Sequence, residues 1–406
     1  MDYCGIVITG TSFAGKTTIA RKLVEINKGF ALVQALTTRK QREDDRTGEY
    51  LYLSEEEFSK LDKQGDLLIK SKYRGNDYYG IAIKTFKELA ISGLVPVLVV
   101  TPESVQQLEE TQQNKPDGRL SFLTIFLDAP DNILDERLKD RGQQSTKSIT
   151  DQRLNDRQYE KLCIYTIINT DLAKTTALIT SLWEFRNNEG ILPKRLIKLM
   201  IECGALLENA QLENISGASY DLMLADDHYY GGKPVSLTEQ NPFIMIEPFE
   251  FAFVRSKEIC NLPRDVAGRF DVAVSLFLQG LIISNGPQVD PGFRGGLWCL
   301  LFNTSNDTVQ LKRGQHYATV EFSKLLHPTH PYEGKYQDKE KIADYLPRSA
   351  SRSPISGLKD DIRTLKSEKW WIKTLPLVLS IVALLATIIF AVLSLTVFRS
   401  PSPPGP

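Results

Sequence analysis

The chain has 406 residues, of which 42% are hydrophobic and 24% charged. This composition fits two or three globular domains and excludes a fibrous or largely disordered chain. Lys and Arg total 49 against 50 Asp and Glu, so a nucleic-acid partner is not expected, because polyanion binding normally needs a basic face. The five cysteines are an odd number and lie far apart, which argues against a disulfide framework and favours a reducing compartment. The first residues, MDYC, show no basic stretch followed by an apolar run, so no secretory signal is expected.

Residues 1–188 are expected to form an α/β domain around a parallel sheet. Short apolar runs at 4–9, 94–100 and 120–127 are typical of parallel strands that are covered on both faces. Amphipathic, charged segments lie between them, such as 18–26, whose apolar residues share one helical face. This alternation predicts a sheet with helices on both sides.

A phosphate-binding loop follows the first predicted strand. Residues 10–17, GTSFAGKT, match G-x-x-x-x-G-K-[ST] and stand between an apolar strand and an amphipathic helix. Lys16 would reach the β- and γ-phosphates of ATP, and Thr17 would offer its hydroxyl to Mg²⁺, while the start of the helix adds its positive end. The residues expected to bind the nucleotide here are Gly10, Thr11, Ser12, Ala14, Gly15, Lys16, Thr17 and Thr18.

The sequence pattern changes at residue 190, and residues 190–340 are expected to form an all-β domain. After one predicted helix at 194–203, short apolar runs at 242–254, 275–284 and 295–303 are separated by Gly, Pro and Asn. Such spacing predicts a β-sandwich or barrel.

The C-terminal part is expected to carry a membrane-spanning helix. Residues 375–398 contain no charged side chain, and as a helix they would span about 36 Å against a hydrocarbon core of about 30 Å. A buried core helix is the alternative. Three lysines, at 366, 369 and 373, precede the run and Arg399 follows it, so the positive-inside tendency places the N-terminal domains in the cytoplasm. The expected segments are a polar linker at 341–372, the helix at 373–399 and a short tail at 400–406.

Residues 4–185 resemble guanylate kinase, a P-loop nucleoside-monophosphate kinase. The resemblance rests on segments at 37–42, 48–50, 54–58, 75–80, 137–142 and 168–172, together with Arg153. It implies that Arg39, Arg42, Tyr50 and Tyr79 bind the acceptor and that Asn169 lies on the adenine side. It also implies that Arg137, Arg141 and Arg153 act with Lys16 in catalysis by neutralising the transferring phosphoryl group. Arginine suits that role because its planar fork meets phosphate oxygens and stays charged.

The guanine-reading positions of that family are changed in this chain. The family's serine, glutamate, aspartate and second serine fall at Ala35, Ile69, near Thr101 and at Ile81. A buried site that lacks its hydrogen-bonding partners rejects the matching base strongly. GMP is therefore not expected as the acceptor, and another nucleotide, a phosphorylated small molecule or no acceptor at all stay open.

Residues 191–340 resemble the dCTP deaminase branch of the dCTP deaminase/dUTPase superfamily. The matching segments are at 218–222, 262–269, 286–295, 313–314 and 331–337, with Asn303. The resemblance implies a trimer with nucleotide sites between subunits. However, the family's R-S-S triplet falls at 273–275, which is AVS, and its catalytic glutamate falls at Leu300, so no side chain there can shuttle a proton. Lys335, Tyr336 and Gln337 match a nucleotide-contacting segment, and they fit residual ligand binding and ordinary packing equally well.

Three functions follow from this arrangement. The first is a membrane-anchored, ATP- and Mg²⁺-dependent kinase with altered base specificity, whose second domain oligomerises or binds nucleotide without catalysis. The second is a non-catalytic nucleotide sensor or scaffold at the membrane. The third, an active deoxypyrimidine triphosphate deaminase or diphosphatase, is weakest because of Leu300. The four histidines and five cysteines show no zinc-site spacing.

Overall fold

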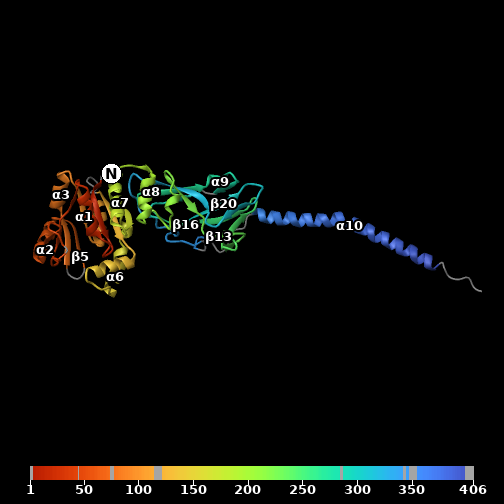
Figure 1. Cartoon of the computed structure of the whole chain (residues 1–406), viewed down its shortest axis with the longest axis horizontal. Coiled ribbons are helices and arrows are strands. Elements are labelled where there is room, and N and C mark those ends of the chain that lie inside the picture. Colours follow the sequence, from red (N-terminus) through yellow and green to blue (C-terminus); the bar gives the residue numbers. More distant parts are fainter. Residues whose placement is uncertain are drawn as a thin grey trace, which may run out of the picture.

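A computed structural model describes residues 3–43, 45–73, 77–113, 121–283, 287–341, 344–346 and 354–397. Figure 1 shows two folded domains joined near helix α8 (Lys194–Glu202) and a long C-terminal helix that projects from them. Residues 75 and 76 of the predicted acceptor loop and the tail from 398 onward lie outside the described residues.

The first domain is built on a five-stranded parallel sheet in the order β2-β7-β1-β8-β9. The predicted apolar runs form its centre, because side chains on both faces of β8 are buried. Its strands are β1 (Tyr3–Gly10), β2 (Phe30–Leu32), β7 (Val95–Val99), β8 (Ser121–Asp128) and β9 (Tyr165–Ile168). Its helices are α1 (Lys16–Ile26), α3 (Ile83–Ile91), α4 (Pro102–Gln113), α5 (Asp131–Asp140), α6 (Lys147–Arg157) and α7 (Leu172–Glu184), with a short turn η1 (Glu160–Leu162). The predicted α/β fold of this region is confirmed.

A separate four-stranded sheet in the order β4-β3-β6-β5 forms one wall of the first domain. Its strands are β3 (Ala35–Thr37), β4 (Tyr50–Tyr52), β5 (Leu67–Tyr73) and β6 (Asp77–Ala82). Helix α2 (Glu55–Gln64) packs beside it and starts at a capping box in which Ser54 and Glu57 bond each other's backbone N–H.

The second domain is rich in β-strands, as predicted. One sheet runs β10-β22-β17-β19 with β12 on β22, a second runs β14-β13-β16-β20-β18 with β11 on β16, and β15 pairs with β21. The strands are β10 (Gly190–Ile191), β11 (Leu207–Glu208), β12 (Ser219–Met223), β13 (Asp227–Tyr230), β14 (Lys233–Ser236), β15 (Phe243–Ile246), β16 (Phe251–Asn261), β17 (Val266–Val272), β18 (Leu281–Ile283), β19 (Gln288–Val289), β20 (Arg294–Asn303), β21 (Val309–Lys312) and β22 (His316–Lys324). A short turn, η2 (Leu212–Asn214), lies between β11 and β12.

The apolar run at 275–284 differs from the expectation of continuous strand. Its first part is a short helix, α9 (Val274–Phe277), and only its second part enters the sheet as β18. Gly280 separates the two with a φ of 90°, and a Cβ there would lie 2.8 Å from the Cβ of Ser305. A left-handed residue breaks the extended run, and glycine is the residue that tolerates it.

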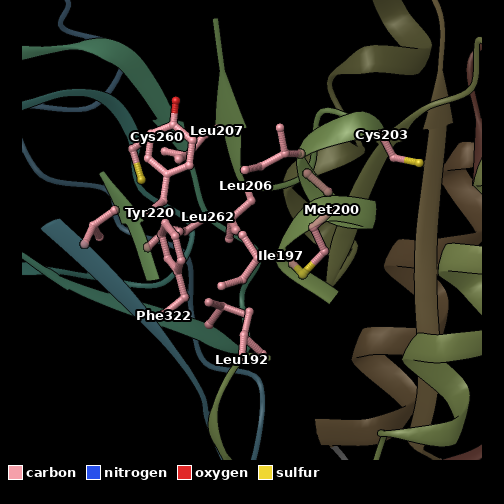
Figure 2. Close-up of a cluster of buried hydrophobic side chains, with 14 of the residues drawn as sticks. Leu192, Ile197, Met200, Cys203, Leu206, Leu207, Tyr220, Cys260, Leu262 and Phe322 are labelled. Atoms are coloured by element: carbon pink, nitrogen blue, oxygen red, sulfur yellow. The ribbon is translucent and has the colours of Figure 1, made fainter. Parts of the chain in front are cut away.

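The two domains share one apolar core. Ile197 and Met200 of α8 are fully buried in a single cluster that reaches from β1 to Phe322 of β22. Figure 2 shows these α8 side chains against Leu262 and Phe322 of the second domain. Buried apolar area of this kind holds domains together far more firmly than a polar interface does, so we treat the two domains as one folded unit.

Polar contacts cross the same interface. The Tyr165 hydroxyl of β9 donates to Asp265 Oδ2 (2.8 Å), and Lys324 Nζ lies 3.8 Å from that oxygen. Burial raises the pKa of Asp265 to about 6, against the opposing attraction of Lys324. Arg264 Nη1 donates to Glu109 of α4 (2.6 Å) and to the Leu162 carbonyl (2.7 Å). The second domain is therefore bonded to β9, α4 and η1 of the first domain.

The C-terminal helix α10 (Pro354–Val397) has 44 residues and includes Pro376. It begins well before residue 373, so the second half of the predicted polar linker is helical and continuous with the apolar run. Within it, Thr374–Ser394 is long and apolar enough to cross a membrane, and none of it is buried against the rest of the chain.

Candidate active site

The loop between β1 and α1 has the curled backbone that a phosphate needs. Gly10 has a φ of 137°, and a Cβ there would lie 2.0 Å from the Leu127 carbonyl oxygen. Gly15 has a φ of 91°, and a Cβ there would lie 2.8 Å from Asn169 Nδ2. Side chains at these two positions would push the loop away from β8 and from Asn169. The two glycines thus bring the N-terminus of α1 to the mouth of the site, where it favours anions.

Three of the predicted residues brace this loop. Asn169 Nδ2 donates to the Ala14 carbonyl (2.7 Å), and Arg137 donates to the carbonyls of Asn169 (2.7 Å) and Ala14 (3.2 Å). Lys16 Nζ bends back to the carbonyls of Gly10 (2.7 Å) and Thr11 (2.9 Å). Arg137 therefore fixes the loop's shape rather than reaching into the open cavity, while Lys16 needs only a rotation of its flexible chain to meet a phosphate.

The other two predicted lid arginines face Phe13 of the loop. The guanidinium carbons of Arg141 and Arg153 each lie 5.9 Å from the Phe13 ring centre, a cation–π distance. Arg153 is only 3% exposed, and its Nη1 donates to Asp135 Oδ1 (2.7 Å). The structure thus brings both arginines to the loop.

A carboxylate that sequence reasoning missed also meets the loop. Asp156 of α6 is fully buried and accepts from the Ser12 N–H (2.9 Å) and the Ser12 hydroxyl (3.0 Å). It lies three residues after Arg153, on the same face of α6. This i, i+3 spacing was the available signal. Asp156 ties the lid helix to the loop, so the two are positioned together.

A cavity of about 740 Å³ opens beside the loop. The predicted residues that line it are Lys16, Thr17, Arg42, Tyr50 and Tyr79, so the structure brings them together around one cavity. Thr18, by contrast, lies on α1 with an exposed side chain.

Arg39 lines the cavity but is held by a second missed carboxylate. Its Nη1 and Nη2 donate to the two oxygens of Asp45 (2.7 Å each), and its guanidinium lies over the Tyr50 ring at 4.6 Å. Burial alone would raise the pKa of Asp45, but hydrogen bonds from Arg39, the Tyr52 hydroxyl and the Arg42 N–H hold it well below its usual range. Much of the Arg39 fork is thus neutralised within its own loop.

Several buried polar atoms around the loop lack a hydrogen-bond partner among the described residues. They are Thr11 Oγ1, Asn169 Oδ1, Glu103 Oε2, and Nε and Nη2 of Arg153. Unpaired buried polar atoms are costly and uncommon. The two guanidinium N–H groups fit phosphate oxygens, and Glu103, whose pKa is raised by burial, is influenced by the nearby charge of Lys16. The residues present therefore fit a nucleoside triphosphate with its metal.

The predicted ligand residues of the second domain pack against their own chain. Gln337 donates to the Gly292 carbonyl (3.0 Å) and accepts from the Arg294 N–H (3.2 Å). The Tyr336 ring stacks on Tyr345 at 5.2 Å, and Lys335 Nζ lies 4.8 Å from the Tyr336 ring centre.

The positions that the resemblance assigns to the family's catalytic groups lie in β20 and at the start of α9, where Val274 is 72% exposed. Leu300 lies in β20 opposite Phe253 of β16, and residues 273–275 form the start of α9. The structure supplies no carboxylate or arginine at these positions.

Comparison with known proteins gave two family matches. A family model described as guanylate kinase matches residues 4–184, and one described as dCTP deaminase-like matches residues 191–325. The dCTP deaminase of Thermococcus gammatolerans is 35% identical over 144 residues, which are 35% of this chain and 90% of that protein. The guanylate kinase of Prochlorococcus marinus subsp. pastoris is 31% identical over 157 residues, 38% of this chain and 80% of that protein. A solved guanylate kinase from Anaplasma phagocytophilum covers 46% of this chain and 87% of its own, with 20% identity and a TM-score of 0.37.

Proposed function

This chain belongs to the guanylate kinase family through residues 4–184 and to the dCTP deaminase family through residues 191–325, and we propose that it is a membrane-anchored kinase. It transfers a phosphoryl group from ATP to a phosphorylated acceptor other than GMP. In this proposal residues 1–188 carry the chemistry, and residues 190–340 form a non-catalytic module that binds nucleotide or assembles the chain into a trimer.

The observation that carries the kinase proposal is the set of unpartnered, buried donors beside the glycine loop. Nε and Nη2 of Arg153 have no hydrogen-bond partner among the described residues, and the Arg153 guanidinium lies at the same Phe13 ring as that of Arg141. Preorganised donors in a site of low water content stabilise developing charge strongly. Phosphoryl transfer needs this kind of charge stabilisation more than it needs a covalent group.

The residues divide the work in a simple way. The loop N–H groups and Lys16 hold the triphosphate, Arg141 and Arg153 neutralise the transferring group, and Asn169 and Arg137 keep the loop in shape. Thr17 would hold Mg²⁺, which when bound supplies positive charge to the phosphates. Arg39, Arg42, Tyr50 and Tyr79 orient the acceptor in the cavity.

The experiment uses the full chain in detergent with ATP, Mg²⁺ and a panel of phosphorylated acceptors. We expect ADP to form with one class of acceptor, and we expect Lys16→Ala to abolish that activity. Lys22→Ala is the matched control, because Lys22 lies on the same helix and pairs with Glu25 (3.0 Å) at a distance from the cavity. Persistent turnover in Lys16→Ala would remove the assignment.

A nucleotide sensor is the second candidate. The observation in its favour is the Arg39–Asp45 pair, which neutralises an acceptor-side arginine within its own loop. A sensor would bind ATP and hydrolyse it slowly whichever acceptor is present. An ADP yield that does not depend on any acceptor would favour it over the kinase.

The membrane anchor rests on the exposed apolar side chains of α10. Within Thr374–Ser394 none of the helix is buried, and leaving this much apolar surface in water is strongly unfavourable. A bilayer would bury it, and the preceding lysines would place the two domains in the cytoplasm.

Vesicle flotation tests the anchor. The double variant Ile381→Lys with Leu385→Lys should no longer float with the vesicles, because each charge near the bilayer centre costs about 2.5–3.5 kcal/mol. Ile91→Lys, at an exposed site on α3, is the control. Flotation of the double variant would contradict a spanning helix.

A further inference from the structure

One row of side chains crosses the small sheet and forms a wall of the acceptor cavity. Tyr50 of β4 pairs with Ala35 of β3, Ala35 with Ile81 of β6, and Ile81 with Ile69 of β5. Partners in register face the same side of a sheet, and all four residues line the cavity. Ala35, Ile81 and Ile69 are 9%, 2% and 3% exposed, so they meet a ligand as a closed apolar surface.

The row has a charged end and an apolar end. At the β4 edge the Arg39 guanidinium lies 4.6 Å above the Tyr50 ring. Ile69 lies three strands away, which at about 4.8 Å per strand is roughly 14 Å. A phosphate at the Arg39 end would thus place the rest of its molecule along Ala35, Ile81 and Ile69, a length that a nucleoside monophosphate fills.

A second part of the cavity lining lies around the end of β7. Val99, Val100 and Pro102 line the cavity there, together with Thr101 and Ser104. The Thr101 hydroxyl donates to Ser71 Oγ (2.8 Å) and lies 2.9 Å from Ser104 Oγ. These hydroxyls bond to one another, so they can offer a small number of polar contacts to one edge of a ligand.

Such a pocket selects against a base with polar groups on both edges. A donor or acceptor buried against the isoleucines would lose its water and gain no partner. A methyl group placed there gains contact instead, and among the common bases thymine carries a methyl at C5. Its carbonyl edge would then face the Thr101–Ser104 hydroxyls.

We infer that the acceptor is a pyrimidine nucleoside monophosphate with an apolar 5-substituent, of the dTMP type, whose methyl group lies on the Ala35–Ile81–Ile69 row. The inference rests on the proposed kinase function for the phosphoryl transfer itself. The binding preference, however, can be measured whether or not transfer occurs.

The first experiment compares dTMP, dUMP, dCMP, AMP and GMP as acceptors for the full chain with ATP and Mg²⁺. We expect kcat/KM for dTMP to exceed that for dUMP by about 10-fold, the value of one methyl in an apolar pocket. We expect GMP to be worse than dTMP by about 100-fold or more, because its polar edge is unpartnered. Equal use of dUMP and dTMP, or better use of GMP, would overturn the inference.

Two further outcomes separate this inference from the proposed function. Lys16-dependent turnover with a phosphomonoester that is no nucleotide would leave the kinase standing and overturn the inference. If no acceptor supports turnover, calorimetry of dTMP and GMP binding decides. Tighter dTMP binding would then support the inference while the kinase proposal falls, and absence of dTMP binding would overturn both.

Substitutions in the row provide the second experiment. Ala35→Ser combined with Ile69→Glu places a hydroxyl and a carboxylate where a guanine edge could bond, and it should lower the dTMP-to-GMP preference by about 100-fold. Leu51→Ser, at an exposed position beside Tyr50, is the control and should change nothing.

A milder change guards against misfolding of the double variant. Ile81→Val removes one methylene from the row and should lower the dTMP-to-dUMP ratio a few-fold, since it leaves a gap beside the ligand. An unchanged preference in both folded variants would show that the row does not read the base.

Discussion

The two family domains differ in whether the side chains at their predicted ligand-binding positions have partners within the chain. In the guanylate kinase domain, Nε and Nη2 of Arg153 have no partner among the described residues, and the guanidinium lies over Phe13, which lines a cavity of about 740 Å³. In the dCTP deaminase domain, Gln337 and Tyr336 are bonded or stacked within the chain, and Leu300 stands in the sheet. Unpartnered donors next to a residue that lines a cavity fit a ligand site, whereas bonded or stacked side chains fit a packed structure. The described part of the second domain has unpartnered buried atoms as well, Asp265 Oδ1 and Trp298 Nε1, but Asp265 lies at the domain interface.

The second domain also shows which of its residues take part in packing. The second domain still contributes Leu262 and Phe322 to the shared core and Arg264 and Asp265 to the interface. Core packing is kept because its loss destabilises the whole chain. Groups that act only on a ligand can be replaced at little cost to stability.

The largest effect is expected from a substitution of Arg153 in the guanylate kinase domain. Arg153→Met removes the unpartnered donors but keeps much of the apolar stem over Phe13. We expect acceptor-dependent kcat to fall by about 10²–10³-fold, the usual result of losing one preorganised donor. Steady-state kinetics measures it, with a thermal melt as the check on folding. A kcat within about threefold of wild type would mean that Arg153 is structural.

The second prediction concerns the loop carboxylate that holds Arg39. Asp45→Asn removes a buried counter-charge, so the free protein should lose about 3 kcal/mol of its unfolding free energy. An acceptor phosphate can then replace the missing charge, and the rise in melting temperature on adding acceptor should be larger than in wild type. An unchanged or smaller rise would show that Arg39 does not meet the phosphate.

The third prediction concerns Asp265, at the interface between the two domains. Burial raises the pKa of Asp265 from its ordinary 3.8 to about 6, so the folded state holds the proton more tightly than the unfolded state. The contribution of Asp265 to stability is therefore fully present below pH 3.8 and falls as the pH rises through 6.

Asp265→Asn removes this titration. Relative to the variant, the wild-type chain should gain about 2 kcal/mol of unfolding free energy between pH 7 and pH 4.5. Urea unfolding at the two pH values measures the difference. If the unfolding free energy of the wild-type chain fell relative to that of the variant between pH 7 and pH 4.5, the raised pKa of Asp265 would be contradicted.

The smallest expected effect is on the deaminase side. Restoring the family's groups with Ala273→Arg and Leu300→Glu should yield no deamination of dCTP, because Gln337 and Tyr336 remain packed in the chain. Ammonia release is the readout, and binding of dCTP by calorimetry is the second measurement. Any deamination by this variant would show that the pocket is intact and that only two side chains were lost.

Much of the fold could be predicted from the sequence, because its signals are local. The loop at 10–17 needs two glycines at a fixed spacing of five residues, and the structure places both Gly10 and Gly15 at positive φ values. The apolar runs predicted β1, β7 and β8, since strands buried on both faces are continuously apolar. The run at 275–284 is not one continuous strand, and the sequence around it does not reveal that Ser305 lies close to Gly280.

The hydrogen-bond partners of the carboxylates in the candidate site could not be predicted from the sequence. Asp45 stands among many charged residues, and no local pattern marks it as the partner of Arg39. Asp156 lies three residues after Arg153, but that spacing does not reveal its bond to Ser12, which is 144 residues away. The same holds for Asp265, whose partner Tyr165 lies one hundred residues away. Charged groups acquire their roles from neighbours that only folding supplies.

The sequence by itself determined the phosphate loop, the two family domains and the apolar C-terminal helix, because each depends on residue spacing along the chain. Only the tertiary structure decided that the two domains share one core, that Arg137 braces the loop while Arg153 is left with unpaired donors, and that Ala35, Ile81 and Ile69 form one surface. Those facts depend on strand register and on side chains brought together from distant segments, and a linear pattern carries no record of either.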